Sequence, residues 1–252
     1  MQITFIEAVF VTCALSIASN VFFGATLGNV SCKYHLTYSP STEAFAIWSV
    51  IYLLGFITIF SQWASDNLML ADPYANLFYS VAWLSAAIWT PIFVTDKKCS
   101  HILAAFVLCV CGGCALTAAV IEHSWQRGVE ERRRWYIGAP FSMLAGWTLC
   151  AAAISIGIAK QANGNNTPHT DCTSERRGYN MFNTNINTES YSYAPFFLAT
   201  IATILSSILP DPILPIPVMW CIFHMKSSYL NCAGFLLLTA GCLIAIARIY
   251  LL

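Results

Sequence analysis

Three cysteines close together are the first residues whose type and spacing could do chemistry. Cys109, Cys111 and Cys114 stand in the segment Cys-Val-Cys-Gly-Gly-Cys, and three thiolates can bind a soft metal ion. On a helix, however, Cys111 and Cys114 share a face while Cys109 points largely elsewhere. No histidine or carboxylate stands nearby to complete a ligand set. We interpret the segment as a small-residue face that lets two helices approach closely, and we expect no metal site.

Acids and bases are scarce in the apolar parts of the chain. Glu7 lies near the N-terminus, His224 near the end of an apolar run and Asp211 in a proline-rich break. Ion and proton pathways need ionisable groups inside the membrane, and general acid–base catalysis needs the same residue types. No Ser-His-Asp set, phosphate loop or HExxH motif is present. We therefore expect neither a pump nor an enzyme; modification of a bound porphyrin, with only tryptophan and tyrosine as reactive groups, is the minor alternative.

Aromatic rings are abundant instead. They make up 14% of the residues and include eight tryptophans. Membrane interfaces account well for some of these, namely Trp63, Trp125 and Trp135. Four others, Trp48, Trp83, Trp89 and Trp147, sit inside predicted spans. Aromatic walls without charges can form a pocket for a flat or apolar ligand, and the alternative is ordinary packing in the core or against lipid.

Membrane helices must position these rings. Apolar residues make up 58% of the 252 positions and charged residues 10%, whereas a soluble domain carries about 25% charged residues. A helix crosses the hydrocarbon core in about 20 residues. Apolar runs near this size cover residues 3–27, 44–63, 75–95, 101–121, 137–159, 191–209, 212–225 and 229–252. The predicted fold class is an all-α polytopic membrane protein.

The seventh run leaves the number of spans open. It begins among four prolines, Pro210, Pro212, Pro215 and Pro217. Proline is tolerated in a first helical turn but not in a helix interior, so a helix beginning at 215 or 217 is either a short span or a re-entrant half-helix. The chain then has seven or eight spans, with two or three of them C-terminal.

Charge and cysteine usage limit the function classes further. The net charge is zero, which argues against a nucleic-acid partner, since such proteins cluster lysine and arginine on one face. The first residues contain no Lys or Arg, so we read the first apolar run as a retained helix and not as a cleaved signal. Three cysteines lie in loops, Cys32, Cys99 and Cys172; they are either free thiols or include one disulfide.

Motifs in three of the runs resemble a known family. The segment from Tyr38 to Tyr52 has a proline-containing loop, then Trp48, then Ile-Tyr52 three residues on, and a following Gly55. This pattern resembles the loop and second helix of the translocator-protein family, also called the tryptophan-rich sensory (TspO/MBR) proteins. Two further segments agree with the family's third and fifth helices, Trp89-Thr-Pro91-Ile-Phe93 and Ala145-Gly146-Trp147. The resemblance covers about residues 1–160.

The resemblance implies an architecture and a function. It implies a TspO-like five-helix transmembrane bundle in residues 1–160 with a cavity opening toward one side, followed by a polar loop at 161–190 and C-terminal membrane helices at 191–252. Family members bind porphyrins and some bind sterols, they are usually dimeric, and eukaryotic ones are often mitochondrial. We thus expect an integral protein of a mitochondrial membrane that contacts membrane lipids, binds an apolar small molecule and forms a homodimer or joins a larger complex.

Carried over by position, the resemblance assigns site residues. The residues implied to line or support the pocket are Trp48, Tyr52, Trp89, Pro91, Phe93 and Trp147. Loop residues 38–41, including Tyr38 and Pro40, are implied to form its lid. No cofactor is required, and the implied ligand is a tetrapyrrole, a sterol or another lipid.

Departures from the family pattern motivate an alternative. The family's Asn-Trp pair before the third-helix tryptophan is Ala86-Ala87 here, and an asparagine late in its fifth helix is Ser155. Polar groups that would orient a ligand are thus replaced. The alternative hypothesis is a structural accessory subunit, without a ligand, of a large membrane complex, with a mitochondrial respiratory complex as the expected host.

Overall fold

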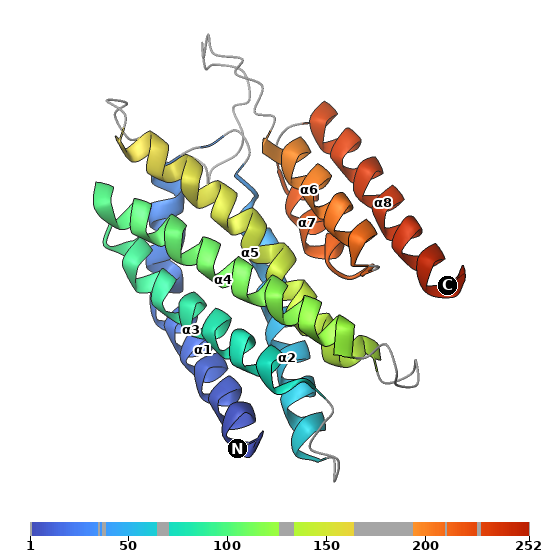
Figure 1. Ribbon diagram of the computed structural model, residues 1–252. Coiled ribbons are helices and arrows are strands. Elements are labelled where there is room, and N and C mark those ends of the chain that lie inside the picture. The colour runs from blue at the N-terminus through green and yellow to red at the C-terminus, as the bar shows by residue number, and fades with distance from the viewer. Residues whose placement is uncertain are drawn as a thin grey trace.

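The chain folds into helices. The computed structural model describes residues 2–34, 36, 39–64, 71–125, 134–163, 194–209, 211–225 and 228–251. Every regular element of this described part is a helix (Figure 1). In chain order they are α1 (Gln2–Lys33), the short 3-10 helix η1 (Thr42–Ala46), α2 (Ile47–Trp63), α3 (Pro73–Val94), α4 (Lys98–Trp125), α5 (Arg134–Asn163), α6 (Ala194–Ile208), α7 (Pro215–Phe223) and α8 (Ser228–Leu251). The predicted all-α membrane fold is confirmed, and each predicted apolar run corresponds to one helix.

The start of α3 shows how local sequence sets a helix boundary. The Asp72 carboxylate accepts hydrogen bonds from the backbone N–H groups of Tyr74 and Ala75 at 2.8 and 3.3 Å. Pro73 stands at the first helical position, where its missing N–H costs nothing and its fixed φ suits the helix. The backbone N–H of Asp72 itself donates to the Glu122 carboxylate of α4 at 3.0 Å. One residue therefore caps α3 and ties it to the end of α4.

The first five helices form a closed bundle. Helix α1 packs along α3, α3 along α4, and α4 along α5, while α2 lies between α5 and α1 and closes the ring (Figure 1). Helices α1 to α5 are long and apolar enough to cross a membrane. Large apolar side chains also point outward, including Phe22 at 84% exposure and Val21 at 79%. Such a surface suits a lipid environment, because hydrocarbon chains solvate it without cost.

Helices α6, α7 and α8 pack against one another as a second group beside α5 (Figure 1). Helix α7 has nine residues, which at 1.5 Å per residue covers about 13 Å of a hydrocarbon core of about 30 Å. It begins at Pro215 with Pro217 in its first turn, as the prolines predict. The seventh run is therefore a short half-helix and not a span. Most of the polar stretch at 161–190 lies outside the described residues, and the domain boundaries at 160 and 191 stay predictions.

Candidate ligand site in the aromatic core

Six aromatic side chains from α2, α3 and α5 form one continuous series of ring contacts inside the bundle. Neighbouring ring centroids lie 4.4 to 6.3 Å apart, in the order Phe141, Tyr79, Trp83, Tyr52, Trp48 and Trp147. Tyr52 stacks between Trp48 and Trp83, with interplanar angles of 24° and 21°. Offset stacked and edge-to-face pairs at these distances attract each other. Their side chains belong to one buried cluster, with Tyr52 at its margin.

Helix geometry brings the α2 part of this cluster together. Trp48, Tyr52 and Gly55 stand at positions i, i+4 and i+7, so they share one helix face. Gly55 has no side chain, and the space is filled by the Trp83 ring: a Cβ at position 55 would lie 3.5 Å from it. The glycine that follows the Trp and Tyr motif thus lets the α3 tryptophan reach the stacked pair.

A small polar network lies beside the rings, and sequence reasoning missed it. The Asn20 amide donates to the Tyr52 hydroxyl, which also lies 3.2 Å from the Ser16 hydroxyl. Thr90 of α3 donates to the Asn20 side-chain oxygen at 3.4 Å. Ser16 and Thr90 are fully buried. Asn20, an amide side chain within the first apolar run, is the sequence signal that could have revealed these polar contacts between α1, α2 and α3.

Two tryptophans have a buried polar group without a partner. The indole N–H groups of Trp89 and Trp147 are buried and make no hydrogen bond within the described residues. A buried donor left unpaired costs about 1 to 3 kcal/mol. Native proteins pair most such groups. Unpaired indole donors beside flat rings are the arrangement that an acceptor-bearing aromatic or ring-shaped molecule would complete.

Trp89 and Phe93 lie in a second aromatic group, nearer the ends of α3 and α1. Trp89 contacts Phe93 with ring centroids 5.5 Å apart. Phe93 contacts the His101 ring at 5.2 Å, and His101 contacts Tyr34 at 4.9 Å. The two groups belong to separate buried clusters. The structure therefore brings Trp48, Tyr52 and Trp147 together and places Trp89 and Phe93 apart from them.

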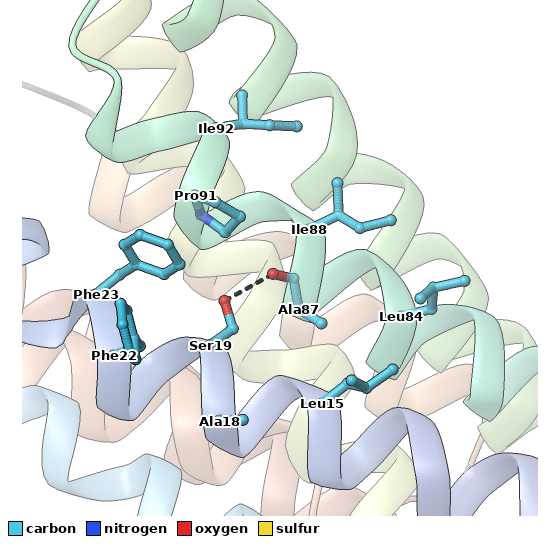
Figure 2. A pocket seen from close by; sticks show the side chains of 10 residues that line it. All are labelled: Leu15, Ala18, Ser19, Phe22, Phe23, Leu84, Ala87, Ile88, Pro91 and Ile92. Atoms are coloured by element: carbon cyan, nitrogen blue, oxygen red, sulfur yellow. Dashed lines mark hydrogen bonds between the residues drawn. The ribbon is translucent and has the colours of Figure 1, made fainter.

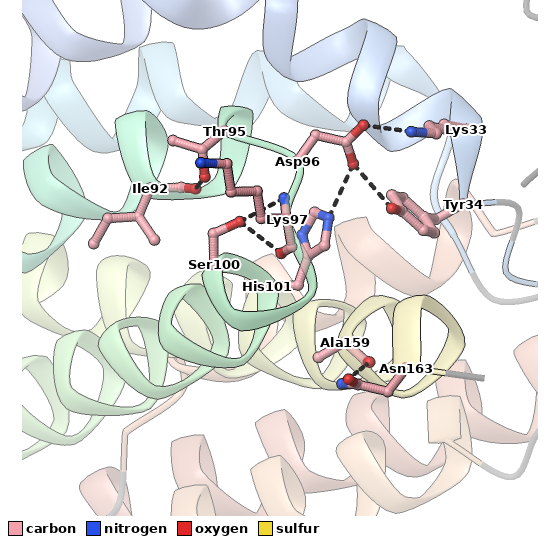
Figure 3. Close-up of polar contacts among 10 residues, drawn as sticks. All are labelled: Lys33, Tyr34, Ile92, Thr95, Asp96, Lys97, Ser100, His101, Ala159 and Asn163. Carbon is pink, nitrogen blue, oxygen red and sulfur yellow. Dashed lines mark hydrogen bonds and ion pairs between the residues drawn. The ribbon is translucent and has the colours of Figure 1, made fainter. Parts of the chain in front are cut away.

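A polar cluster, which we call the latch, lies next to this second group and consists of Lys33, Tyr34, Asp96 and His101 (Figure 3). Lys33 forms an ion pair with one oxygen of Asp96. The other oxygen lies 2.9 Å from the Tyr34 hydroxyl and 3.1 Å from Nε2 of His101. The backbone of Asp96 is left-handed, with φ at 52°, a conformation that aspartate tolerates better than most residues. The latch therefore fixes the end of α1 to the turn between α3 and α4.

Burial and hydrogen bonding act in opposite directions on the pKa of Asp96 in the latch. Burial raises the pKa of the Asp96 carboxyl, but hydrogen bonds from Lys33, Tyr34 and His101 outweigh it, so the net pKa is lowered. Burial, followed by the hydrogen bond to Asp96, raises the pKa of Tyr34 to about 12. Asp96 is therefore ionised and Tyr34 protonated at neutral pH, which is the pairing that the geometry requires.

Pro91 faces away from the aromatic core. It lines an outward groove of about 500 Å³ between α1 and α3, together with Phe22, Phe23 and other apolar side chains (Figure 2). Proline has no N–H, so the carbonyl of residue i−4, Ala87, loses its helical donor. The Ser19 hydroxyl of α1 donates to that carbonyl at 2.8 Å (Figure 2). The proline of the third-helix motif thus serves the contact between α1 and α3.

The predicted lid residues are only partly described. Tyr38 lies outside the described residues. Pro40 forms an isolated bridge with Met225, and the Ser41 N–H donates to the His224 carbonyl at 2.9 Å. Cys32 lies in α1 and Cys99 in the first turn of α4, so the prediction that both lie in loops is wrong; Cys172 lies outside the described residues. Cys99 and Cys109 are exposed free thiols. Buried Cys111 donates to the Ala82 carbonyl of α3 at 3.1 Å, in line with the predicted close approach of two helices.

Fold and site together define a class: a polytopic helical membrane protein whose five-helix bundle encloses stacked aromatic side chains. A model of the family described as TSPO-like protein matches residues 2–171. The chain belongs to this family, which confirms the resemblance drawn from the motifs. The match covers α1 to α5, and α6 to α8 follow it. Comparisons with curated proteins and with solved structures gave no match.

Proposed function

We propose that the protein binds a flat, apolar ligand in the aromatic core of its bundle, and that the ligand is a tetrapyrrole, a sterol or another lipid. The unpartnered indole N–H group of Trp147 carries this proposal. It stands at one end of the series of ring contacts that runs through Trp48 and Tyr52, so binding would combine stacking with a hydrogen bond.

The chemistry of the core favours binding over catalysis. The groups next to the stacked rings are hydroxyls and an amide, from Ser16, Asn20, Tyr52 and Thr90. Hydroxyl and amide groups orient a ligand, whereas acid–base catalysis needs a group that exchanges protons near neutral pH. The proposed activity is therefore that of a receptor or carrier and not of an enzyme. By family membership we also propose a mitochondrial membrane as its location, which cell fractionation with a tagged protein would test.

Titration with protoporphyrin IX tests the binding proposal. We expect protoporphyrin IX, added to the protein in mild detergent, to quench tryptophan fluorescence well beyond a detergent blank. Trp147→Phe keeps a ring but removes the N–H donor, and should weaken binding about five- to tenfold, since a hydrogen bond is worth about 1 kcal/mol or somewhat more. Replacing Trp48 and Trp147 together by alanine should abolish binding.

The matched control is Trp63→Phe, because Trp63 lies at the end of α2 and is 43% exposed. This variant should bind protoporphyrin IX as the unmodified protein does. Quenching no greater than the detergent blank, or equal binding by the Trp48 and Trp147 double variant, would overturn the proposal. A parallel titration with a fluorescent sterol distinguishes the two ligand classes.

One observation favours a further membrane helix against the bundle, which the accessory-subunit alternative and a homodimer both require. The outer face of α1 is open: a Cβ added to Gly24 or Gly28 would meet no heavy atom within 4 Å, and the neighbouring Val21 and Phe22 are exposed. Small residues on such a face suit close packing against a further membrane helix, from a second copy or another subunit. Native gel migration in mild detergent decides between them, since a band near the dimer mass supports a homodimer and a band of several hundred kilodaltons supports a complex.

A further inference from the structure

The short helix α7 is held tightly against α5, one residue away from the aromatic site. Gly146 of α5, directly before Trp147, faces the start of α7: a Cβ at Gly146 would lie 2.4 Å from the backbone oxygen of Leu214 and 2.8 Å from the Pro217 ring. Ser142, one turn earlier on α5, donates a hydrogen bond to the Asp211 carboxylate. Only glycine allows this close an approach of α7 to α5.

Asp211 also organises the turn that begins α7. Its carboxylate accepts from the backbone N–H groups of Ile213 and Leu214 at 2.8 and 3.3 Å. On the next turns, the thiol of Cys221 lies against that of Cys150 in α5, and both are fully buried. The side of the bundle next to Trp147 is therefore covered by a segment of the same chain.

The other end of α7 holds the loop before α2. The Trp220 indole N–H donates to the Ala44 carbonyl in η1 at 2.8 Å. Further along, the Ser41 N–H donates to the His224 carbonyl at 2.9 Å. Phe45, next to Ala44, has its ring 5.8 Å from that of Trp147. Ser41, in the predicted lid at 38–41, and Ala44, in η1, are thus both bonded to the C-terminal end of α7.

We infer that residues 211–225, which we call the α7 clamp, hold the loop at 39–46 closed over the aromatic site and set the rate at which a ligand enters and leaves it. Asp211 and Trp220 act as positioning residues, and Gly146 leaves the space in which the start of α7 packs against α5. This inference rests on the proposed function, because it concerns access to that same site. It assigns α7, which follows the family match, a role in ligand exchange.

Such a clamp should set the rates at which the ligand enters and leaves, and not its affinity. The bonds that the variants remove join Asp211 to Ser142 and Trp220 to Ala44, so loosening them should leave the contacts of the rings of Trp48, Tyr52 and Trp83 with a bound ligand in place. Opening the loop faster accelerates entry and exit equally, because both pass through the same open state. Association and dissociation rates then rise together, and Kd stays nearly constant. A residue that touched the ligand would change Kd instead, and one that merely stabilised the fold would change neither rate.

Stopped-flow measurements on the full-length protein in mild detergent test this. Trp220→Phe removes the bond to Ala44 but keeps a ring, and Asp211→Asn weakens the turn; each should raise both rate constants for protoporphyrin IX about three- to tenfold, the scale of one lost hydrogen bond. Phe223→Leu is the control, because Phe223 lies on the same helix and is 72% exposed. It should leave both rates unchanged.

A second readout does not depend on any ligand. Labelling of Cys150 by N-ethylmaleimide, located by peptide mass spectrometry, should be slow in the unmodified protein and in Phe223→Leu, and faster in Trp220→Phe and Asp211→Asn. Unchanged exchange rates and unchanged labelling in both clamp variants would overturn the clamp while leaving ligand binding intact. Failure of the unmodified protein to bind protoporphyrin IX and the sterol probe would overturn the proposed function instead.

Discussion

Replacing Gly146 by alanine should dislodge α7 and destabilise the protein, against the usual trend for helices. In an open helical position, alanine is favoured over glycine by about 1 kcal/mol. At position 146, however, the added Cβ would meet the Leu214 oxygen at 2.4 Å, about 1 Å short of ordinary contact. The obstacle is backbone, so a side-chain rotation cannot relieve it and α7 has to move.

The magnitude follows from these opposing terms. Overpacking of this kind costs about 1 to 3 kcal/mol. Movement of α7 would also break the bonds of Trp220 to Ala44 and of Ser142 to Asp211, each worth about 1 kcal/mol. After subtraction of the helical gain of alanine, we expect Gly146→Ala to lower the free energy of unfolding by about 2 to 4 kcal/mol.

Equilibrium unfolding by sodium dodecyl sulfate in mixed micelles, followed by circular dichroism, measures this change. Gly138→Ala is the matched control: Gly138 lies two turns earlier on α5, and a Cβ there would meet nothing within 4 Å. The control should be unchanged or stabilised by up to about 1 kcal/mol. If both variants are stabilised alike, α7 does not press on Gly146 and the reasoning is refuted.

Three further perturbations have expected outcomes. Burial raises the pKa of Asp96 and its hydrogen-bond partners lower it, with a net lowering. The charged carboxylate therefore stabilises the fold at pH values above the unfolded-state pKa, and this stability is lost as the pH falls through the folded-state pKa. Below about pH 4, the thermal midpoint should fall more in the unmodified protein than in Asp96→Asn. Ser19→Ala should destabilise the protein by about 1 to 3 kcal/mol, because it leaves the Ala87 carbonyl unpaired. In a Pro91→Ala background the cost should be much smaller, because alanine at position 91 restores the helical N–H donor. An equal cost in both backgrounds contradicts this account. Gly55→Leu should push the Trp83 ring away and weaken protoporphyrin IX binding at least tenfold, whereas Gly55→Ala, with its Cβ in ordinary contact at 3.5 Å, should bind nearly normally.

Much of the fold follows from the sequence, because membrane helices are encoded locally. A run of about 20 apolar residues must form a helix in lipid, where each backbone N–H and C=O needs an internal partner. The eight runs therefore correspond to α1 to α8. The prolines at 215 and 217 likewise predict where α7 begins, since proline fits a first turn.

The contacts that assemble the site could not be predicted, since they join distant residues. Trp220 and Ala44 are 176 positions apart, and Ser142 and Asp211 are 69 apart. In neither pair does the spacing in the sequence indicate that the two residues are in contact. Pro91 was assigned to the pocket by resemblance, but its place on the helix directs it to the groove beside α1. Trp48, Tyr52 and Trp147, by contrast, are grouped by the family resemblance, and the structure brings their rings into contact with one another.

The indole N–H groups themselves test the central claim most directly. Protein labelled with ¹⁵N in its tryptophan indoles gives separate signals, assignable by single Trp→Phe variants. On addition of protoporphyrin IX, we predict a downfield shift for Trp147 as its donor gains an acceptor, with the exposed Trp63 unmoved. Shifts confined to Trp63, or none at saturating porphyrin, would contradict an aromatic core that binds a flat ligand.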